Sequence, residues 1–426
     1  MSNEGAKKIE AIKAIQKKLL GKKLAYHEVY AIMDEIAHER LSDVLTTYFV
    51  AASFKEGYTP QELYHFTKAM VETGNQLNFK GIVADKHSTG GVSGARTTMI
   101  LVPIIASAGF KIPKISSRAI TSPAGTADVM EVLADVNFTP KQIEKIVNDI
   151  GGCVAWNGHL GIAPADDIII KVEEPLSFES FDKIIISIMA KKIAASTTHL
   201  VLDIPVGKTM KIRHFVDAEK VAQKFRMLGE KFNMKIVTDV NETLEPPGRG
   251  VGPVLEARDV LYVLEQKSDR PLKLEAKALR LAGKLLDLCF KDSKKNSLRQ
   301  LADGGGEEEA KRILTEGIAL KKFREIIKAQ KGNDQITSEK MKLSPHKIEI
   351  SSLKSGKIKD INNYNLNTVA KVLGAPNDKK AGIYLLKKLD EIVEKKEPMF
   401  VLYSSDKYCL KEAEVTLKSF PIYTMI

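Results

Sequence analysis

Two consecutive strand, loop and helix units constrain the fold of this chain most. The first is a short apolar strand, Gly81–Ala84, followed by the glycine-rich loop His87–Gly94 and an apolar helix over Thr97–Ala108. The second runs from a strand over Lys111–Ser116 through a loop of small polar residues, Ser116–Gly125, into a further helix. Strand, loop and helix repeated in this order predict a parallel α/β sheet.

The regions on either side follow other patterns. Residues 1–76 carry apolar side chains at three-to-four spacing and are predicted to form several helices. Beyond Asn333 the pattern changes to short strands interrupted by polar residues, which indicates a separate β-rich module. Its strands are expected over Lys347–Ser351, Gly356–Ile361 and Met399–Tyr403, around a helix over Leu366–Val372.

Charge and composition narrow the class of partner. The 65 Lys and Arg residues exceed the 54 Asp and Glu residues by 11, which favours an anionic ligand. Aromatic residues make up only 6% of the chain and there is one tryptophan, Trp156, which we expect in the core. No basic run is interleaved with stacking side chains, so a small anionic substrate is favoured over nucleic acid.

The three cysteines, Cys153, Cys289 and Cys409, lie far apart, so neither a zinc site nor a disulfide framework is predicted. The histidines show no metal-ligand spacing, and we expect no metal. The lysine-rich start has no signal-peptide pattern and no apolar run is long enough to span a membrane, so a cytoplasmic protein is expected.

The glycine-rich loop is suited to holding phosphate. Adjacent glycines let the backbone approach a ligand closely, and the free N–H groups of the next helix attract anions. Lys86, Ser88 and Thr97 can complete such a cradle. The segment has neither the nucleoside triphosphate nor the dinucleotide loop spacing. A glycine-rich turn without a ligand is the alternative.

The second loop strengthens this interpretation, because its hydroxyl, lysine and arginine donors should meet the first loop at the carboxyl edge of the sheet. The alternative is that its Ser and Thr residues only cap the helix at Thr126. The candidate residues for binding phosphate or nucleotide here are Ser116, Ser117, Arg118, Ala119, Ile120, Thr121, Ser122 and Thr126.

At these two segments the chain resembles the pyrimidine-type nucleoside phosphorylases, the family of thymidine phosphorylase and AMP phosphorylase. Asp-Lys-His-Ser-Thr-Gly-Gly-Val at 85–92 is similar to the family's phosphate-loop signature, and the sequence at 116–128 is similar to the AMP phosphorylase branch. Further segments that resemble this branch lie at 163–167, 189–192, 203–207 and 252–257.

The resemblance implies a pentosyltransferase that uses inorganic phosphate as a substrate and needs no cofactor. The reaction implied is AMP plus phosphate giving ribose 1,5-bisphosphate and adenine. The alternative enzyme reaction is phosphorolysis of thymidine to 2-deoxyribose 1-phosphate and thymine, and a basic protein that binds nucleic acid or phosphorylated ligands is the alternative outside the enzymes. The positions that match the family's phosphate site are Lys86, Ser88, Gly90, Gly91, Thr97, Ser116 and Thr126.

The departing base needs a general acid, and the sequence leaves three candidates. His87 lies in the signature loop and resembles a residue near the base in thymidine phosphorylase. The AMP phosphorylase branch implies a carboxyl group at the position of Glu179, which we place first, and Asp182 lies close by in the sequence.

Ser187, Lys191 and Lys211 match positions that contact the base or nucleotide in the family. Val172 stands where thymidine phosphorylases carry an arginine, and losing that arginine argues against thymidine as the preferred substrate.

The fold class expected is α/β, with a small helical domain, a larger domain with a mixed, mostly parallel sheet, and a C-terminal α+β module. Following the family's layout, the helical domain should comprise residues 1–76 and 165–197, the α/β domain 77–164 and 198–335, and the module 336–426. The AMP phosphorylase branch carries an additional N-terminal domain, whereas the helices start at once here, so we expect a homodimer through the helical domain.

Overall fold

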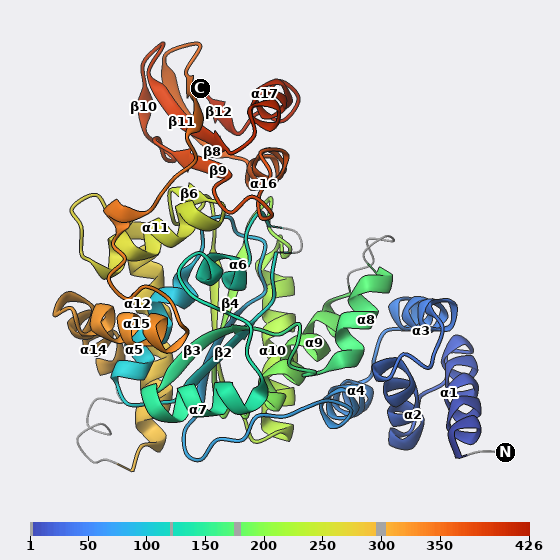
Figure 1. Cartoon of the computed structure of the whole chain (residues 1–426). Helices are drawn as coiled ribbons and strands as arrows, with labels where there is room; N and C mark the ends of the chain where they lie inside the picture. The colour runs from blue at the N-terminus through green and yellow to red at the C-terminus, as the bar shows by residue number, and fades with distance from the viewer. Residues whose placement is uncertain (1–2, 120–121, 174–179, 295–303) are drawn as a thin grey trace.

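The computed structural model describes residues 3–119, 122–173, 180–294 and 304–426 and arranges them in three parts (Figure 1). A bundle of helices lies at one side of an α/β core, and a β-rich module sits at one end of that core. No helix in these ranges is both long and apolar enough to cross a bilayer.

The helical part combines the start of the chain with a later segment. Its helices are α1 (Asn3–Leu19), α2 (Tyr26–Ala37), α3 (Asp43–Glu56), α4 (Pro60–Glu72), α8 (Pro164–Glu173) and α9 (Phe181–Ala194). Helix α4 starts at Pro60, because Thr59 caps it and proline is favoured in the first turn of a helix. Helices α8 and α9 pack against α2, α3 and α4, and Phe49 and Phe66 are buried in this part.

The core contains parallel strands in two groups. Strands β1 (Ala84–Ser88), β4 (His199–Val206) and β5 (Lys235–Glu242) form a parallel sheet in the order β1, β4, β5. Strands β2 (Ile112–Ser116) and β3 (Gly152–Trp156) form a parallel pair. A parallel bridge between Val83 and Lys111 joins the two groups, so the ends of β1 and β2 meet at one edge.

Helices cover both faces of these strands. The elements are α5 (Thr97–Ser107), α6 (Thr126–Glu131), α7 (Pro140–Ile150), α10 (Phe215–Lys231), α11 (Pro253–Leu264), α12 (Leu272–Asp292), α14 (Gly305–Thr315) and α15 (Ile318–Ala329). Leu200 and Leu202 of β4 face a core shared with α7 and α10, while Val201 faces α5 and α12. This alternation explains why β4 is apolar on both sides and fully buried.

The C-terminal module is antiparallel and is joined to the core by a strand. Its elements are β7 (His346–Ser351), β8 (Gly356–Ile361), α16 (Asn363–Val372), β9 (Gly382–Leu385), β10 (Ile392–Val393), β11 (Pro398–Ser404), α17 (Lys407–Thr416) and β12 (Tyr423–Met425). A short strand from the core, β6 (Gly250–Val251), pairs with β9 and completes the sheet β6, β9, β11, β7. The module therefore stands on the core through backbone hydrogen bonds.

The predicted fold class is confirmed, but two details of the core differ from the prediction. The first strand runs over Ala84–Ser88 and not over Gly81–Ala84, because Asp85 and Lys86 are buried inside the sheet despite their charge. Strand β3 and helix α7 were not predicted. Helices α8 and α9 contact α2, α3 and α4, and the predicted division of the chain into domains stays a prediction.

Candidate active site

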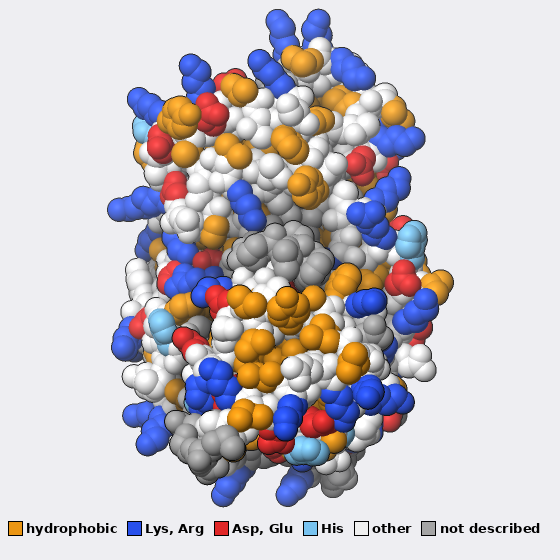
Figure 2. Space-filling view, turned by 90° about the vertical axis from the view of Figure 1, so that its right-hand side faces the viewer, with side chains coloured by type: hydrophobic (Ala, Val, Ile, Leu, Met, Phe, Trp, Pro, Cys, Tyr) orange, Lys and Arg blue, Asp and Glu red, His pale blue; other side chains and the backbone are white. Residues whose placement is uncertain are grey.

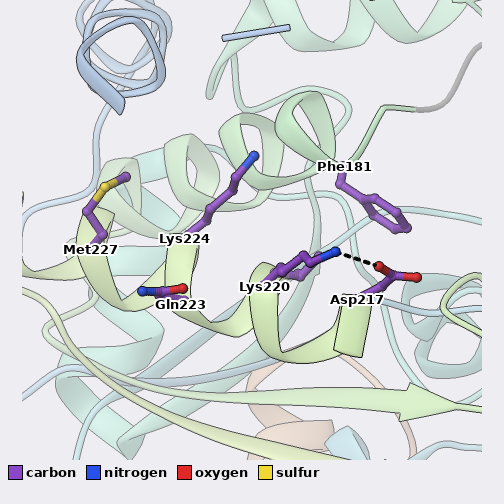
Figure 3. A pocket seen from close by; sticks show the side chains of 7 residues that line it. Phe181, Asp217, Lys220, Gln223, Lys224 and Met227 are labelled. Atoms are coloured by element: carbon purple, nitrogen blue, oxygen red, sulfur yellow. Dashed lines mark hydrogen bonds and ion pairs between the residues drawn. The ribbon is translucent and has the colours of Figure 1, made fainter. Parts of the chain in front are cut away.

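A cleft of about 1190 Å³ lies where the three parts meet. Its walls come from α2 to α4, α8 and α9 of the bundle, from the loops after β1 and β2, and from α16 of the C-terminal module. A smaller hollow of about 390 Å³ lies between the start of α9 and α10 (Figure 3). There Lys220 is paired with Asp217 at 3.3 Å and Lys224 is paired with Asp182, so both ammonium groups already have partners. The large cleft is therefore the candidate site.

The glycine-rich loop enters the cleft from the end of β1. Gly90 and Gly91 have φ angles of +89° and +88°, a conformation that side chains other than glycine rarely adopt. A Cβ atom at Gly91 would lie 3.5 Å from Lys211 Cγ, which is an ordinary van der Waals distance. The Lys211 side chain therefore lies next to the loop at Gly91. Helix α5 begins just beyond the loop without a side-chain cap, which leaves backbone N–H donors at its start.

A cluster of buried charges lies beneath this loop. Asp85 is completely buried. Its carboxylate oxygens form ion pairs with Lys114 Nζ at 3.3 Å and with Lys192 Nζ at 2.5 Å. Burial alone would raise the pKa of Asp85, but the two ammonium groups more than offset it and hold the pKa below its ordinary value. Burial lowers the pKa of Lys114 despite the attraction of Asp85. Two lysines thus share one carboxylate, which leaves the cluster net positive.

Lys86 adds a further cation at the cleft wall. Its side chain is 4% exposed, and its Nζ lies 3.9 Å from Asp203, a carboxylate that also pairs with Lys277 at 3.1 Å. Burial lowers the pKa of Lys86 to about 8, although Asp203 acts in the opposite direction. The long distance to Asp203 leaves the Lys86 ammonium suited to a stronger anionic partner, such as phosphate.

The carboxylate of Asp128 holds the backbone of the second loop at two points. Asp128 accepts hydrogen bonds from the backbone N–H groups of Ala119 and Gly125 at 2.7 and 2.9 Å. Arg118 pairs with Glu131 at 2.5 Å and stacks over the Trp156 ring, with 4.6 Å from its guanidinium carbon to the ring centroid. The Arg118 charge is therefore already balanced, although its side chain lines the cleft.

Trp156 was expected in the core, but the structure places it in the cleft wall. It is half-buried and carries Arg118 on one side and His159 edge-on at 4.7 Å between ring centroids. It ends β3 at the carboxyl edge of the sheet, and since β3 was not predicted its position there was not foreseen either.

Most of the predicted site residues are brought together in this cleft. The predicted residues that line it are Lys86, His87, Ser88, Gly90, Gly91, Ser116, Ser117, Arg118, Ala119, Ser122, Thr126, Ser187, Lys191 and Lys211. Thr97 does not line it, because this residue is fully buried at the first turn of α5, whereas its neighbours Arg96 and Thr98 reach the wall. Glu179, Ile120 and Thr121 lie outside the described residues.

The bundle side of the cleft offers a hydrogen-bonded network. Asp166 accepts from the Ser187 hydroxyl at 2.7 Å and pairs with Lys191 at 2.6 Å, and Asp167 lies 3.7 Å from the same lysine. Burial alone would lower the pKa of Lys191, but the two carboxylates raise it, so the lysine stays charged. The Asp167 side chain is 46% exposed, and its partial desolvation at the cleft wall raises the pKa of its carboxyl. The network presents one hydroxyl, one ammonium and one carboxyl of raised pKa.

Two candidates for the general acid can be placed. Burial, followed by the nearby ammonium groups of Lys192, Lys114 and Lys86, holds the pKa of His87 well below its ordinary value, so the ring is neutral at pH 7. Its Nδ1 is buried without a hydrogen-bond partner among the described residues. Asp182 is bonded to Lys224 and does not line the cleft, so it is not placed to act on a base there.

Comparison with known proteins identifies the family. Residues 12–74 and 80–225 match models described as the glycosyl transferase family, helical bundle domain and a/b domain, and residues 357–420 match the pyrimidine nucleoside phosphorylase C-terminal domain. The AMP phosphorylase of Thermofilum pendens is 42% identical over 409 residues, which cover 96% of this chain and 77% of that protein. The chain belongs to the AMP phosphorylase and thymidine phosphorylase family.

Other relatives agree with this membership of the phosphorylase family. An AMP phosphorylase of Methanococcus maripaludis is 41% identical over 98% of this chain and 81% of its own length. A protein of Bradyrhizobium diazoefficiens, provisionally named a thymidine phosphorylase, is 42% identical over 93% of this chain and 75% of its own length. The family places the chain among the pentosyltransferase enzymes.

The fold is also shared with a solved structure of a different enzyme. Anthranilate phosphoribosyltransferase from Thermus thermophilus superposes with a TM-score of 0.60 over 75% of this chain and 99% of that one, at 19% identity. At this identity the likeness shows the fold alone. Among the described residues of this phosphorylase family member, no group of three or more His, Cys, Asp and Glu side chains is placed to hold a metal ion.

Several residues of the site escaped the sequence analysis. Asp85, Lys192 and Asp203 are buried charges within strands or a helix, and a charged pair inside an apolar strand is the signal that would have found Asp85 and Lys86 together. Asn363 and Lys371 of α16 line the cleft from a module expected to be separate, and no local pattern connects them with it.

Proposed function

We propose that this chain catalyses the phosphorolysis of nucleoside 5′-monophosphates, with AMP and phosphate giving ribose 1,5-bisphosphate and adenine. The observation that carries the proposal is the meeting of two anion-binding loops above buried lysines in one cleft. The AMP phosphorylase relatives support the same substrate.

The chemistry requires a nucleophile on one face of the ribose and a leaving base on the other. A phosphate oxygen forms a bond to C1′ while the glycosidic bond breaks. The electron pair of the glycosidic bond leaves with the base, and the base takes up a proton. Phosphate held by Lys86 and the Gly90–Gly91 turn stabilises the positive charge that develops at the sugar. Phosphate is itself the second substrate, and we propose that the reaction uses no cofactor.

The opposite wall is suited to the base. Ser187 and Lys191, positioned by Asp166, present a hydroxyl and an ammonium group from α9. Apolar side chains that include Phe49, Tyr58 and Phe66 also line this part of the cleft. Domain closure over the cleft would exclude water, which otherwise hydrolyses the activated sugar.

The deciding experiment is an assay of base release. The purified protein is incubated with AMP, CMP, UMP, thymidine and uridine, with and without phosphate, and free base is measured by chromatography. Release from nucleotides that depends on phosphate supports the proposal, whereas release from nucleosides alone identifies a nucleoside phosphorylase. Salt-sensitive RNA retention without any turnover would favour a binding protein.

We also propose that the protein works in the cytoplasm as a homodimer formed through the helical part. The face of the bundle in Figure 2 carries a group of exposed hydrophobic side chains. Val44 and Tyr48 of α3 are 64% and 54% exposed, and Leu20, which follows the last residue of α1, is 72% exposed. Apolar side chains gathered on a surface in this way mark an interface.

A further inference from the structure

The first residue of α16 is hydrogen-bonded to the glycine-rich loop across 270 positions of sequence. Asn363 Oδ1 accepts the backbone N–H of Ser93 at 2.9 Å and lies 2.8 Å from the Ser93 hydroxyl. Asn363 Nδ2 donates to the carbonyl of Gly91 at 2.6 Å. One carboxamide thus bonds both ends of the turn formed by Gly91, Val92 and Ser93.

This contact is buried and specific. Asn363 is 2% exposed and Ser93 is completely buried, so water does not replace these hydrogen bonds when they are lost. The same hydroxyl of Ser93 lies 2.5 Å from Asn367 Oδ1, one turn further along α16. Gly91 needs its positive φ to make the turn, and the flexibility of glycine gives the loop no stiffness of its own.

The same module also reaches the second loop. Lys379 Nζ lies 2.9 Å from Asp128 and 2.9 Å from Glu131, both on α6. Asp128 is the carboxylate that holds the backbone of the second loop at Ala119 and Gly125. The C-terminal module therefore bonds the first loop directly through Asn363, and it contacts the second loop indirectly through Asp128.

We propose that Asn363 is a positioning residue for phosphate: it holds the Gly91–Ser93 turn in the conformation that receives the nucleophile, so the C-terminal module is part of the active site. The proposal deepens the proposed function and rests on it. Asn363 acts through the loop and not through contact with the reacting atoms. Its loss should therefore weaken the binding of phosphate more than the binding of nucleotide.

The test compares two asparagines on one helix. Asn363→Ala removes the contact with the loop, whereas Asn365→Ala removes a side chain whose Nδ2 donates to Pro421 O inside the module. We expect Asn363→Ala to raise the KM for phosphate at least about 10-fold while the KM for AMP changes less than about threefold, and Asn365→Ala to leave both near wild type. Ser93→Ala, a smaller change on the loop side, should raise the phosphate KM in the same direction.

Combining the two changes separates positioning from general damage. Because Asn363 and Ser93 act on one turn, the double variant should lose no more phosphate affinity than Asn363→Ala within about twofold. Equal rises in both KM values, a similar loss in Asn365→Ala, or unchanged phosphate KM in both Asn363→Ala and Ser93→Ala would overturn the proposal.

Phosphate binding without turnover distinguishes this inference from the proposed function. The shift in melting temperature caused by inorganic phosphate is measured in wild type and in Asn363→Ala. If wild type is stabilised by phosphate but releases no base, the proposed reaction is wrong, and a reduced shift in the variant still supports the role of Asn363. If phosphate stabilises wild type and variant equally, the role of Asn363 is wrong whatever the reaction.

Discussion

Lys86 couples phosphate binding to pH. Because burial lowers its pKa to about 8, the ammonium group loses its proton as pH rises through that value, and its attraction for phosphate is lost with it. We expect kcat/KM for phosphate to fall above about pH 8, since this ratio reports groups of the free enzyme. Lys86→Arg should shift the fall to higher pH, and Lys86→Ala should abolish turnover with the fold intact by circular dichroism. Unchanged activity in Lys86→Ala would remove this residue from the phosphate site.

Asp167 is a further candidate for the general acid. Desolvation at the cleft wall raises the pKa of its carboxyl from the ordinary value, and it lines the cleft beside the predicted base contacts. We expect Asp167→Asn to lower kcat about 100-fold, which is the usual size of such a contribution. The comparison variants are His87→Asn and Glu179→Gln. The His87 ring that the first variant removes is neutral at pH 7, because its pKa lies well below the ordinary value. A larger loss in Glu179→Gln than in Asp167→Asn would assign the acid to Glu179.

At the scale of elements, the stability of strand β1 depends on the partners of its buried carboxylate. Replacing Asp85 by Asn leaves Lys192 as a buried cation without its balancing carboxylate. We expect Asp85→Asn to lower the free energy of unfolding by about 3–5 kcal/mol, measured by urea denaturation. Because the pKa of Asp85 lies below its ordinary value, its ion pairs stabilise the fold above about pH 4, and this stabilisation is lost as the pH falls further.

A matched double variant tests the cause of that loss. Lys192 is 1% exposed and bonds Asp85, so Asp85→Asn combined with Lys192→Met removes one charge of each sign from the cluster. The double variant should be more stable than Asp85→Asn alone. A double variant less stable than the single one would show that the charges are not the reason for the loss.

The same strand shows what sequence patterns miss at this scale. The helices α4 and α5 and the strands β2 and β4 were predictable, because a Thr-Pro cap marks α4 and mostly apolar runs mark the other three. Strand β1 was displaced in the prediction, since the ion pairs that allow Asp85 and Lys86 inside a sheet come from distant residues. Burial of a charge depends on its partner, and the partner is not visible locally.

At the scale of the whole molecule, the sequence predicted the two loops and their meeting place but not the third wall. The parallel order of β1 and β2 follows from the repeated unit, and this order brings both loops to one edge. Asn363 reaches Ser93 from a module that its composition marks as separate. The pairing of β6 with β9 joins that module to the core, and nothing near Asn363 in the sequence indicates that pairing.

The dimer is the prediction that belongs to the whole molecule. If the exposed apolar face of α1 and α3 is the interface, a carboxylate buried within it has no partner and separates the subunits. Val44→Glu combined with Tyr48→Glu should reduce the mass measured by light scattering from twice 47.1 kDa to 47.1 kDa. Leu353→Glu is the matched control, because Leu353 is 90% exposed but lies in the C-terminal module, so its replacement should leave a dimer. A wild type of 47.1 kDa, or a dimer that persists in the double variant, would contradict an interface on this face.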